Sequence, residues 1–370
     1  MHPRHRTITR ARGAAAIAAA AILTGCAGAP STADDRPQVV TTTTQLGDFA
    51  REIAGDTAAV TQLLQPGQSA HGYDPTAQAL QALASADLLV VNGAGLEEWL
   101  DATVEASGFD GTVVDVSEHV HLHEGDDHGH AHEHGDHDHA DEHADEHADD
   151  HADAAEEPAE TGDDHADEAS GHDPAHDHGG IDPHFWTDPH NAIHMAQAIG
   201  EALAAADAEH AAEYGQRTSD YLDRLRALDE WIHASVDRVP EAERLLVTSH
   251  DTFTYFAEAY GITSVGAVMP AFDDNAEPSA AAMDALIAQI REMGARAVFA
   301  ESSIDARLAE TIARDAGVRV FAGDDALYAD SLGAPGSAGE TYIGSQIHNV
   351  SRIVESWGAA PLPVPEALAP

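Results

Sequence analysis

The sequence contains no lysine and only one cysteine, Cys26, among its 370 residues. A single cysteine excludes an intramolecular disulfide and any zinc site built from several thiolates. The 17 basic residues are therefore all arginines, and 66 aspartates and glutamates bring the formal net charge to −49. This charge disfavours binding to DNA, RNA or an anionic membrane surface through a basic patch, so we expect no nucleic-acid partner.

Histidine is the residue type that the chain has in excess. There are 26 histidines, and 43% of the residues are hydrophobic, which is enough to give two domains of ordinary size their cores. Imidazole is the commonest metal ligand in proteins. The composition therefore makes metal binding the first functional hypothesis.

The N-terminus has the features of a secretion signal. Several arginines precede the apolar run 14–23, which is too short to span a bilayer. The run ends in Leu-Thr-Gly-Cys, which resembles the lipobox of bacterial lipoproteins. We expect residues 1–25 to be a signal peptide, Cys26 to be lipidated and residues 26–38 to form a tether. The protein would then be extracytoplasmic, anchored to the outer face of the cytoplasmic membrane by its lipid.

The remaining chain alternates between strand and helix patterns. Strand candidates recur between residues 39 and 116 and again between 244 and 321, with helical periodicity between them. This order predicts an α/β fold with two parallel-sheet lobes, 39–190 and 240–370. Residues 191–239 have a helical pattern throughout, with a possible interruption near Gly215, and we expect one long helix there that joins the lobes.

An insertion at 119–178 interrupts the first lobe. It consists mostly of His, Asp, Glu, Ala and Gly, contains no arginine and has almost no large apolar residue. Such a composition cannot form a core and predicts disorder, with many weak and interchangeable metal sites. The alternative is an acidic loop that serves only solubility.

Four side chains stand where predicted strands end or loops follow them. They are His71, His184, His250 and Asp330. In open α/β sheets, ligands bind beyond the carboxyl ends of the strands. A lone histidine at such a position is more often a structural polar residue, so the hypothesis of a binding site depends on all four together, two from each lobe.

Five segments carry a family resemblance in chain order: those around His71 and at 182–188, 249–256, 298–303 and 328–333. They resemble the metal-binding solute receptors of bacterial ABC importers, the zinc and manganese binding lipoproteins. The resemblance implies two lobes joined by one long backbone helix and a metal ion in the inter-lobe cleft. It also implies an ABC transporter permease as partner. One departure is Ala77, which stands where the first motif usually has a second proline after Pro75.

The same resemblance implies His71, His184 and His250 as nitrogen ligands and Asp330 as the oxygen ligand. Three imidazoles and one carboxylate suit four-coordinate Zn2+, whereas a manganese site is expected to hold more carboxylate. Manganese receptors similar to this chain commonly have Glu where His250 stands. The zinc members of the family also carry a His-rich acidic loop, so the resemblance favours the zinc branch and Zn2+ as the bound ion.

Three other side chains near these motifs receive secondary interpretations. Glu301, after the predicted strand 297–300, could accept a hydrogen bond from a ligand imidazole in the second shell, or could be a helix-cap or surface carboxylate. His190 and His194 open the long helix, and we expect them to be structural or solvated.

The sequence therefore predicts a monomeric zinc receptor that delivers Zn2+ to an ABC permease and is not an enzyme. Three alternatives stay open. One is a zinc-dependent surface adhesin or scaffold on the same fold, with a role in cell adhesion, and another is a manganese receptor. The third is a zinc hydrolase, which is disfavoured because the chain has no HExxH motif and the four ligands leave no open position for water.

Overall fold

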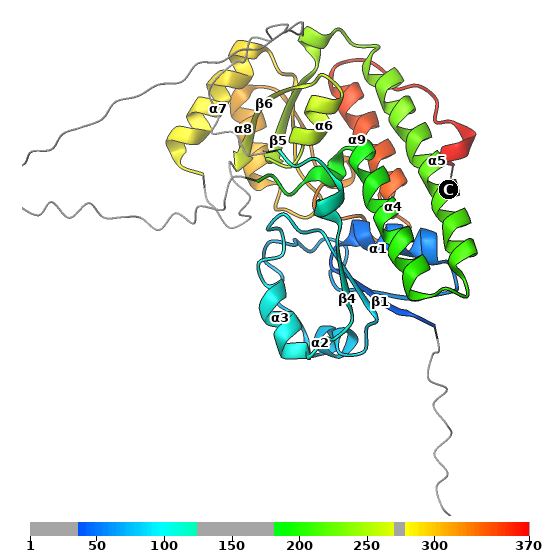
Figure 1. Cartoon of the computed structure of the whole chain (residues 1–370). Helices are drawn as coiled ribbons and strands as arrows, with labels where there is room; N and C mark the ends of the chain where they lie inside the picture. The colour runs from blue at the N-terminus through cyan, green and yellow to red at the C-terminus, as the bar shows by residue number, and fades with distance from the viewer. Residues whose placement is uncertain (1–35, 124–180, 270–277, 370) are drawn as a thin grey trace, which may run out of the picture. The chain divides into compact units, whose positions relative to one another are not determined.

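The computed structural model describes residues 36–123, 181–269 and 278–369, which contain two parallel four-stranded sheets (Figure 1). The N-terminal sheet has the order β2-β1-β3-β4, and the C-terminal sheet has the order β6-β5-β7-β8. The strands of the first sheet are β1 (Gln38–Thr41), β2 (Ala59–Gln62), β3 (Leu88–Val91) and β4 (Thr112–Asp115). Those of the second are β5 (Leu245–His250), β6 (Thr263–Met269), β7 (Ala297–Phe299) and β8 (Arg319–Phe321). The predicted α/β class with two parallel-sheet lobes is confirmed.

Local sequence explains where the elements begin. Strand β3 is the continuous apolar run Leu-Leu-Val-Val and is buried at every position, as expected for a strand of a sheet covered on both faces. Hydroxyl groups cap several helices, and Thr43 and Thr76 each accept the backbone N–H three residues ahead. Helices of the two lobes are α1 (Thr44–Ala54), α2 (Ala77–Leu83), α3 (Leu100–Ser107), α6 (Thr254–Ala259), α7 (Ala280–Met293), α8 (Arg307–Ala316) and α9 (Tyr342–Ser356).

The linking segment 191–239 is not one long helix. It divides into α4 (Pro189–Ala206) and α5 (Ala211–Val236), and Gly215, where an interruption was expected, lies inside α5. The break falls at Asp207, whose backbone leaves helical geometry and whose carboxylate accepts hydrogen bonds from His210 Nδ1 at 2.7 Å and Tyr214 Oη at 3.1 Å. An aspartate that bonds to the following turn in this way begins a new helix rather than continuing the old one.

Helices α4 and α5 pack closely against each other (Figure 1). Gly200 lies at the contact, where a Cβ atom would come within 2.2 Å of Thr218 Oγ1. Helix α5 also packs against α1 and α9. One apolar core therefore extends from the N-terminal sheet through α4, α5 and α9, while a second, smaller core lies beneath α7 and α8.

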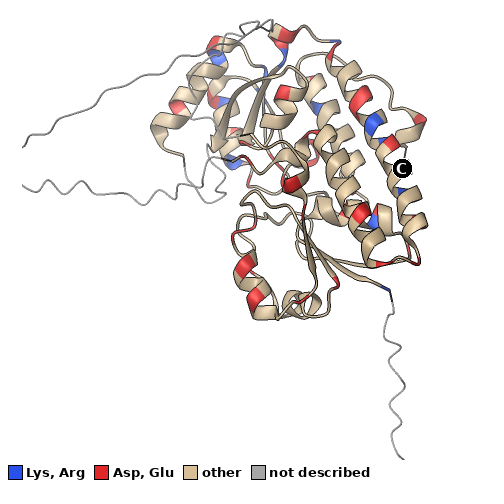
Figure 2. Cartoon of the chain, viewed as in Figure 1, with Lys and Arg blue, Asp and Glu red and all other residues tan. Residues whose placement is uncertain are grey.

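Charged side chains are interspersed on the described helices, and no cluster of arginines stands out in this view (Figure 2). Within the ranges given above, no helix is both long and apolar enough to cross a bilayer. The predicted signal peptide 1–25, Cys26 and nearly all of the insertion 119–178 lie outside the described residues. The lobe boundaries 39–190 and 240–370 stay predictions.

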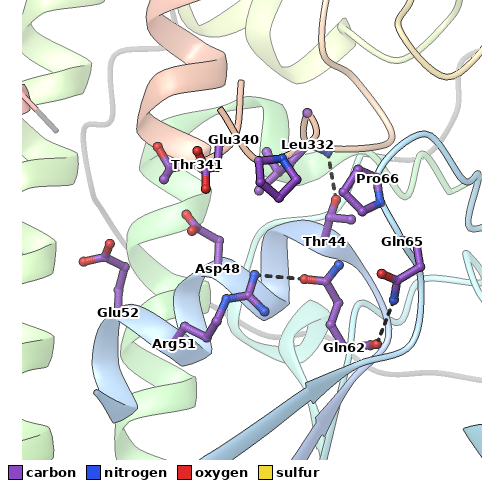
Figure 3. Close-up of a pocket in the computed structure, with 12 residues that line it drawn as sticks. Thr44, Asp48, Arg51, Glu52, Gln62, Gln65, Pro66, Leu332, Glu340 and Thr341 are labelled. Carbon is purple, nitrogen blue, oxygen red and sulfur yellow. Dashed lines mark hydrogen bonds between the residues drawn. The ribbon is translucent and has the colours of Figure 1, made fainter. Parts of the chain in front are cut away.

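Polar contacts join α1 to the segment that follows Asp330 (Figure 3). Thr44 Oγ1 accepts the Leu332 N–H, and Asp48 Oδ2 accepts the Tyr342 N–H, each at 2.8 Å. These contacts border a crevice of about 710 Å³. Burial raises the pKa of Asp48 to about 6, so deprotonation of this carboxyl opposes folding near neutral pH.

We predict that Asp48→Asn stabilises the metal-free protein at pH 8 by roughly 1–3 kcal/mol. The folded-state pKa of Asp48 lies above the unfolded value of about 3.9. The unaltered protein therefore loses stability relative to the variant as pH rises through 6. The amide still accepts the Tyr342 N–H. Urea unfolding at pH 4.5 and pH 8 measures the difference, with exposed Asp101→Asn as control. Equal stabilisation at both pH values would contradict the assignment.

Candidate metal centre

The four predicted ligands come from separate segments that converge on one point. His71 lies in the loop between β2 and α2, and His184 precedes the short 3-10 helix η2 (Phe185–Thr187). His250 is the last residue of β5, and Asp330 follows β8 by a loop. Their ligand atoms fall into two overlapping groups in which all atoms lie within 4.8 Å of one another: His71, His184 and His250, and then His250, Glu301 and Asp330.

The distances fit one tetrahedral ion. His71 Nε2 and His184 Nε2 are 3.2 Å apart, and two nitrogen ligands of one zinc ion with bonds of about 2.0–2.1 Å lie about 3.3–3.4 Å apart. Asp330 places one carboxylate oxygen 3.6 Å from His184 Nε2 and the other 3.7 Å from His250 Nδ1. The ring centroids of the three histidines are 5.3, 5.3 and 5.8 Å apart.

Burial makes this cluster costly without a cation. His184 and His250 are 0% exposed and Asp330 is 2% exposed, whereas His71 is half-buried. Within the described structure, neither carboxylate oxygen of Asp330 has a hydrogen-bond partner. Buried polar atoms normally have one. A divalent ion at the centre of the cluster would satisfy these donor atoms, and His71 marks its more open side.

Glu301 lies closer to the centre than its predicted role as a second-shell acceptor requires. It is 2% exposed, and its carboxylate belongs to the same group as His250 and Asp330. Ser249 Oγ donates a hydrogen bond to Glu301 Oε1 at 3.3 Å. The carboxylate is therefore near enough to supply an oxygen ligand directly, and its alternative interpretation as a surface carboxylate is wrong.

Asp182 is a site residue that the sequence interpretation gave no role. Its Oδ1 accepts from the backbone N–H of His184 at 2.9 Å and lies 2.7 Å from His184 Nδ1. A carboxylate at Nδ1 holds the proton there and leaves the Nε2 lone pair for a metal. The Asp-Pro-His spacing was visible in the sequence, but no rule of spacing links a carboxylate to the imidazole two residues later.

The contact between Asp182 and His184 shifts the pKa of each group so that its charged form is favoured. Burial lowers the pKa of His184, but the hydrogen bond and charge of Asp182, with the charges of Asp330 and Asp251, outweigh burial and raise it overall. Burial raises the pKa of Asp182, and its bonds to His184 outweigh that effect and lower it overall. Asp182 thus stays ionised beside His184.

The backbone next to Asp330 is held from the opposite lobe and from the segment of His184. Gln45 Nε2 and Trp186 Nε1 both donate to the Ala329 carbonyl, at 2.9 and 3.1 Å. The Trp186 ring also packs on His184, with centroids 5.2 Å apart. His190 and His194, which the sequence placed outside the site, are exposed on α4.

Comparison with known proteins identifies the family. The family model ZnuA, described as "Zinc-uptake complex component A periplasmic", matches residues 39–356. The chain belongs to this family. Members of the ZnuA family are metal-binding receptors of ABC importers and not enzymes, and they work with a membrane permease and an ATPase. The zinc hydrolase alternative is therefore excluded.

Relatives in the ZnuA family are named for different metals. The manganese-binding lipoprotein MntA of Halalkalibacterium halodurans is 30% identical over 317 residues, 86% of this chain and 87% of that protein. The iron-binding protein YfeA of Yersinia pestis is 29% identical over 332 residues, 89% of each chain. The periplasmic zinc binding protein TroA of Treponema pallidum is similar in structure, with a TM-score of 0.68 and 25% identity, and the match covers 87% of this chain and 99% of that one.

We predict that Asp182→Asn lowers divalent metal affinity roughly 10- to 100-fold. The amide no longer fixes the Nδ1 proton of His184, so the imidazole loses orientation and basicity. Competition titration against a chelating indicator measures the loss. Glu258→Gln is the matched control, since this exposed carboxylate pairs with nearby His123 and belongs to neither group of converging ligand atoms. An affinity equal to that of the unaltered protein would contradict the role of Asp182.

Proposed function

We propose that the chain is an extracytoplasmic zinc receptor, anchored by lipid at Cys26, that delivers Zn2+ to an ABC permease. The observation that supports zinc is the number of nitrogen donors: three imidazoles converge in a largely buried cluster, with the carboxylates of Asp330 and Glu301 beside His250. Zinc prefers four-coordinate nitrogen and oxygen sites, while manganese prefers a greater share of oxygen. The name of TroA supports zinc, and those of MntA and YfeA do not.

In this proposal the ligands are His71, His184, His250 and Asp330. Each lobe supplies two of them, so the ion also links the lobes. A relative movement of about 1 Å would lengthen bonds of about 2.0–2.2 Å beyond coordination distance, which offers a route for release at the permease. Polar contacts across the boundary, such as Gln45 to the Ala329 carbonyl, would break in the same movement.

Manganese or iron reception is the second candidate, and Glu301 is the observation that favours it. If Glu301 joins Asp330 at the ion, the site holds two carboxylates beside three imidazoles and expands beyond four ligands. The adhesin or scaffold function also stays an alternative. It requires metal binding without uptake, so loss of zinc import on deletion of the chain would argue against it.

We further propose that the His-rich insertion collects zinc for the centre. The described chain before it ends at His123 and resumes at Ile181, and these ends are joined: the Asp182 N–H donates to the His123 carbonyl at 3.3 Å. Tyr255 Oη accepts the His123 N–H and donates to the Asp182 carbonyl, both at 2.9 Å. The chain therefore enters the insertion after His123 and leaves it beside Asp182, two residues before the proposed ligand His184.

We predict one tightly held zinc ion per molecule once residues 124–178 are deleted, with manganese bound far more weakly. Three imidazoles favour Zn2+ over Mn2+ by ligand type and by the general order of divalent affinities. Elemental analysis gives the stoichiometry, and competition titration gives the two affinities. His250→Glu is the informative variant, because it exchanges a nitrogen donor for an oxygen donor. It should reduce the ratio of zinc affinity to manganese affinity. Equal or tighter manganese binding by the unaltered centre would overturn the zinc assignment.

We also predict that deletion of 124–178 reduces the number of zinc ions bound and slows capture, yet leaves the affinity of the centre nearly unchanged. Tethered weak sites raise the local concentration of metal without contributing ligands to the centre. Stopped-flow zinc uptake at low and high ionic strength, with equilibrium titration in parallel, separates rate from affinity. If the deletion abolished tight binding, a histidine of the insertion would have to be a primary ligand.

A further inference from the structure

A pair of histidines outside the metal centre lies on the surface of α4. His190 and His194 are one helical turn apart, both are exposed, and their ring centroids lie 5.0 Å apart with the ring planes at 81°. Two histidines at positions i and i+4 of one helix face can bind the same zinc ion. None of the residues of the metal centre takes part in this pair.

The spacing of this pair matches that of imidazoles that share an ion. With a bond of about 2.0–2.1 Å and a ring centroid about 1.1 Å beyond the nitrogen, two imidazoles on a tetrahedral ion have centroids about 5.2 Å apart. The three histidines of the centre lie at 5.3–5.8 Å by the same measure. The rings of the α4 pair therefore already lie at about the separation of two imidazoles that share an ion.

A neighbouring element brings further imidazoles to the same surface. The 3-10 helix η1 (Val116–His119) packs against α4, and its His119 and the following His121 are exposed. Partial burial lowers the pKa of His194, and the charges of His190, His121 and His119 lower it further. Repulsion of this kind favours the neutral form of the His194 ring, which is the form that binds metal.

We propose that His190 and His194 hold a second divalent ion of the imidazole-preferring class, zinc first, with His119 or His121 as a further ligand. Among the described residues, three or more ligand atoms already converge only at the centre. At α4 a third nitrogen would be supplied by rotation of an exposed side chain. Such a site has fewer fixed ligands and open access to solvent, so it binds more weakly and exchanges faster than the centre.

The test uses the full chain and zinc alone as probe. Diethyl pyrocarbonate acylates free imidazole nitrogens, and mass spectrometry of the digested protein reports each histidine separately. Free zinc is fixed by a chelator buffer, so that the other histidines do not deplete it. We expect labelling of His190 and His194 to slow together, at a higher free zinc concentration than that which protects His71.

The decisive variant is His190→Asn. It removes one of two chelating rings, so half-protection of His194 should require at least about tenfold more free zinc. The matched control is His210→Asn, which alters a half-buried histidine in the turn between α4 and α5 whose Nδ1 pairs with Asp207. The control should leave the protection of His194 unchanged.

Two outcomes would overturn the site: labelling of His194 at the same rate with and without zinc, or equal protection in the His190→Asn variant. The site does not depend on zinc being the ion of the centre. If His194 is protected and His71 is not, the zinc assignment of the centre fails and the α4 site stands.

Discussion

The structure depends on the convergence of ionisable side chains at one buried point. His184, His250 and Asp330 are almost completely removed from solvent. Removing an ion from water costs several kcal/mol unless an opposite charge and hydrogen bonds compensate. A divalent cation meets that requirement, and Asp182 meets part of it in advance by pairing with His184. Because the proposed ligands come from both lobes, this compensation would act only when the two lobes are together.

This constraint explains the polar contacts at the lobe boundary. As a ligand, Asp330 would have to lie within about 2 Å of the ion, and the residue before it is held by hydrogen bonds from Gln45 and Trp186 to the Ala329 carbonyl. Thr44 and Asp48 hold the segment just beyond it. These bonds position a ligand but bury little apolar surface, so each contributes about 1 kcal/mol. The boundary is ordered enough for binding and weak enough to separate.

The sequence predicted the sheets and brought the candidate ligands to one edge for the same reason. Apolar runs such as β3 are long and continuous, and parallel strands place their carboxyl ends at one edge, so His71 and His250 followed from strand positions. The features that the sequence did not predict depend on contacts between side chains. The break at Asp207 arises from bonds to His210 and Tyr214, which compete with an otherwise helical pattern. Helix α3 is short and has no side-chain cap, so its only local signals are Asp101 in the first turn and the left-handed Gly108 after the last turn.

The central cluster and the proposed α4 pair both offer imidazole ligands to a metal ion, but the cluster is buried and the pair is exposed. In the proposed function, the buried centre would gain affinity from its full donor set and from exclusion of water, and it would exchange metal slowly because the lobes would have to separate. An exposed pair of imidazoles on a helix gains speed and loses affinity, since water competes for the remaining positions. His123 and Asp182 join the ends of the insertion beside the segment that carries His184. In this proposal, metal bound first at exposed histidines would be held near the buried centre.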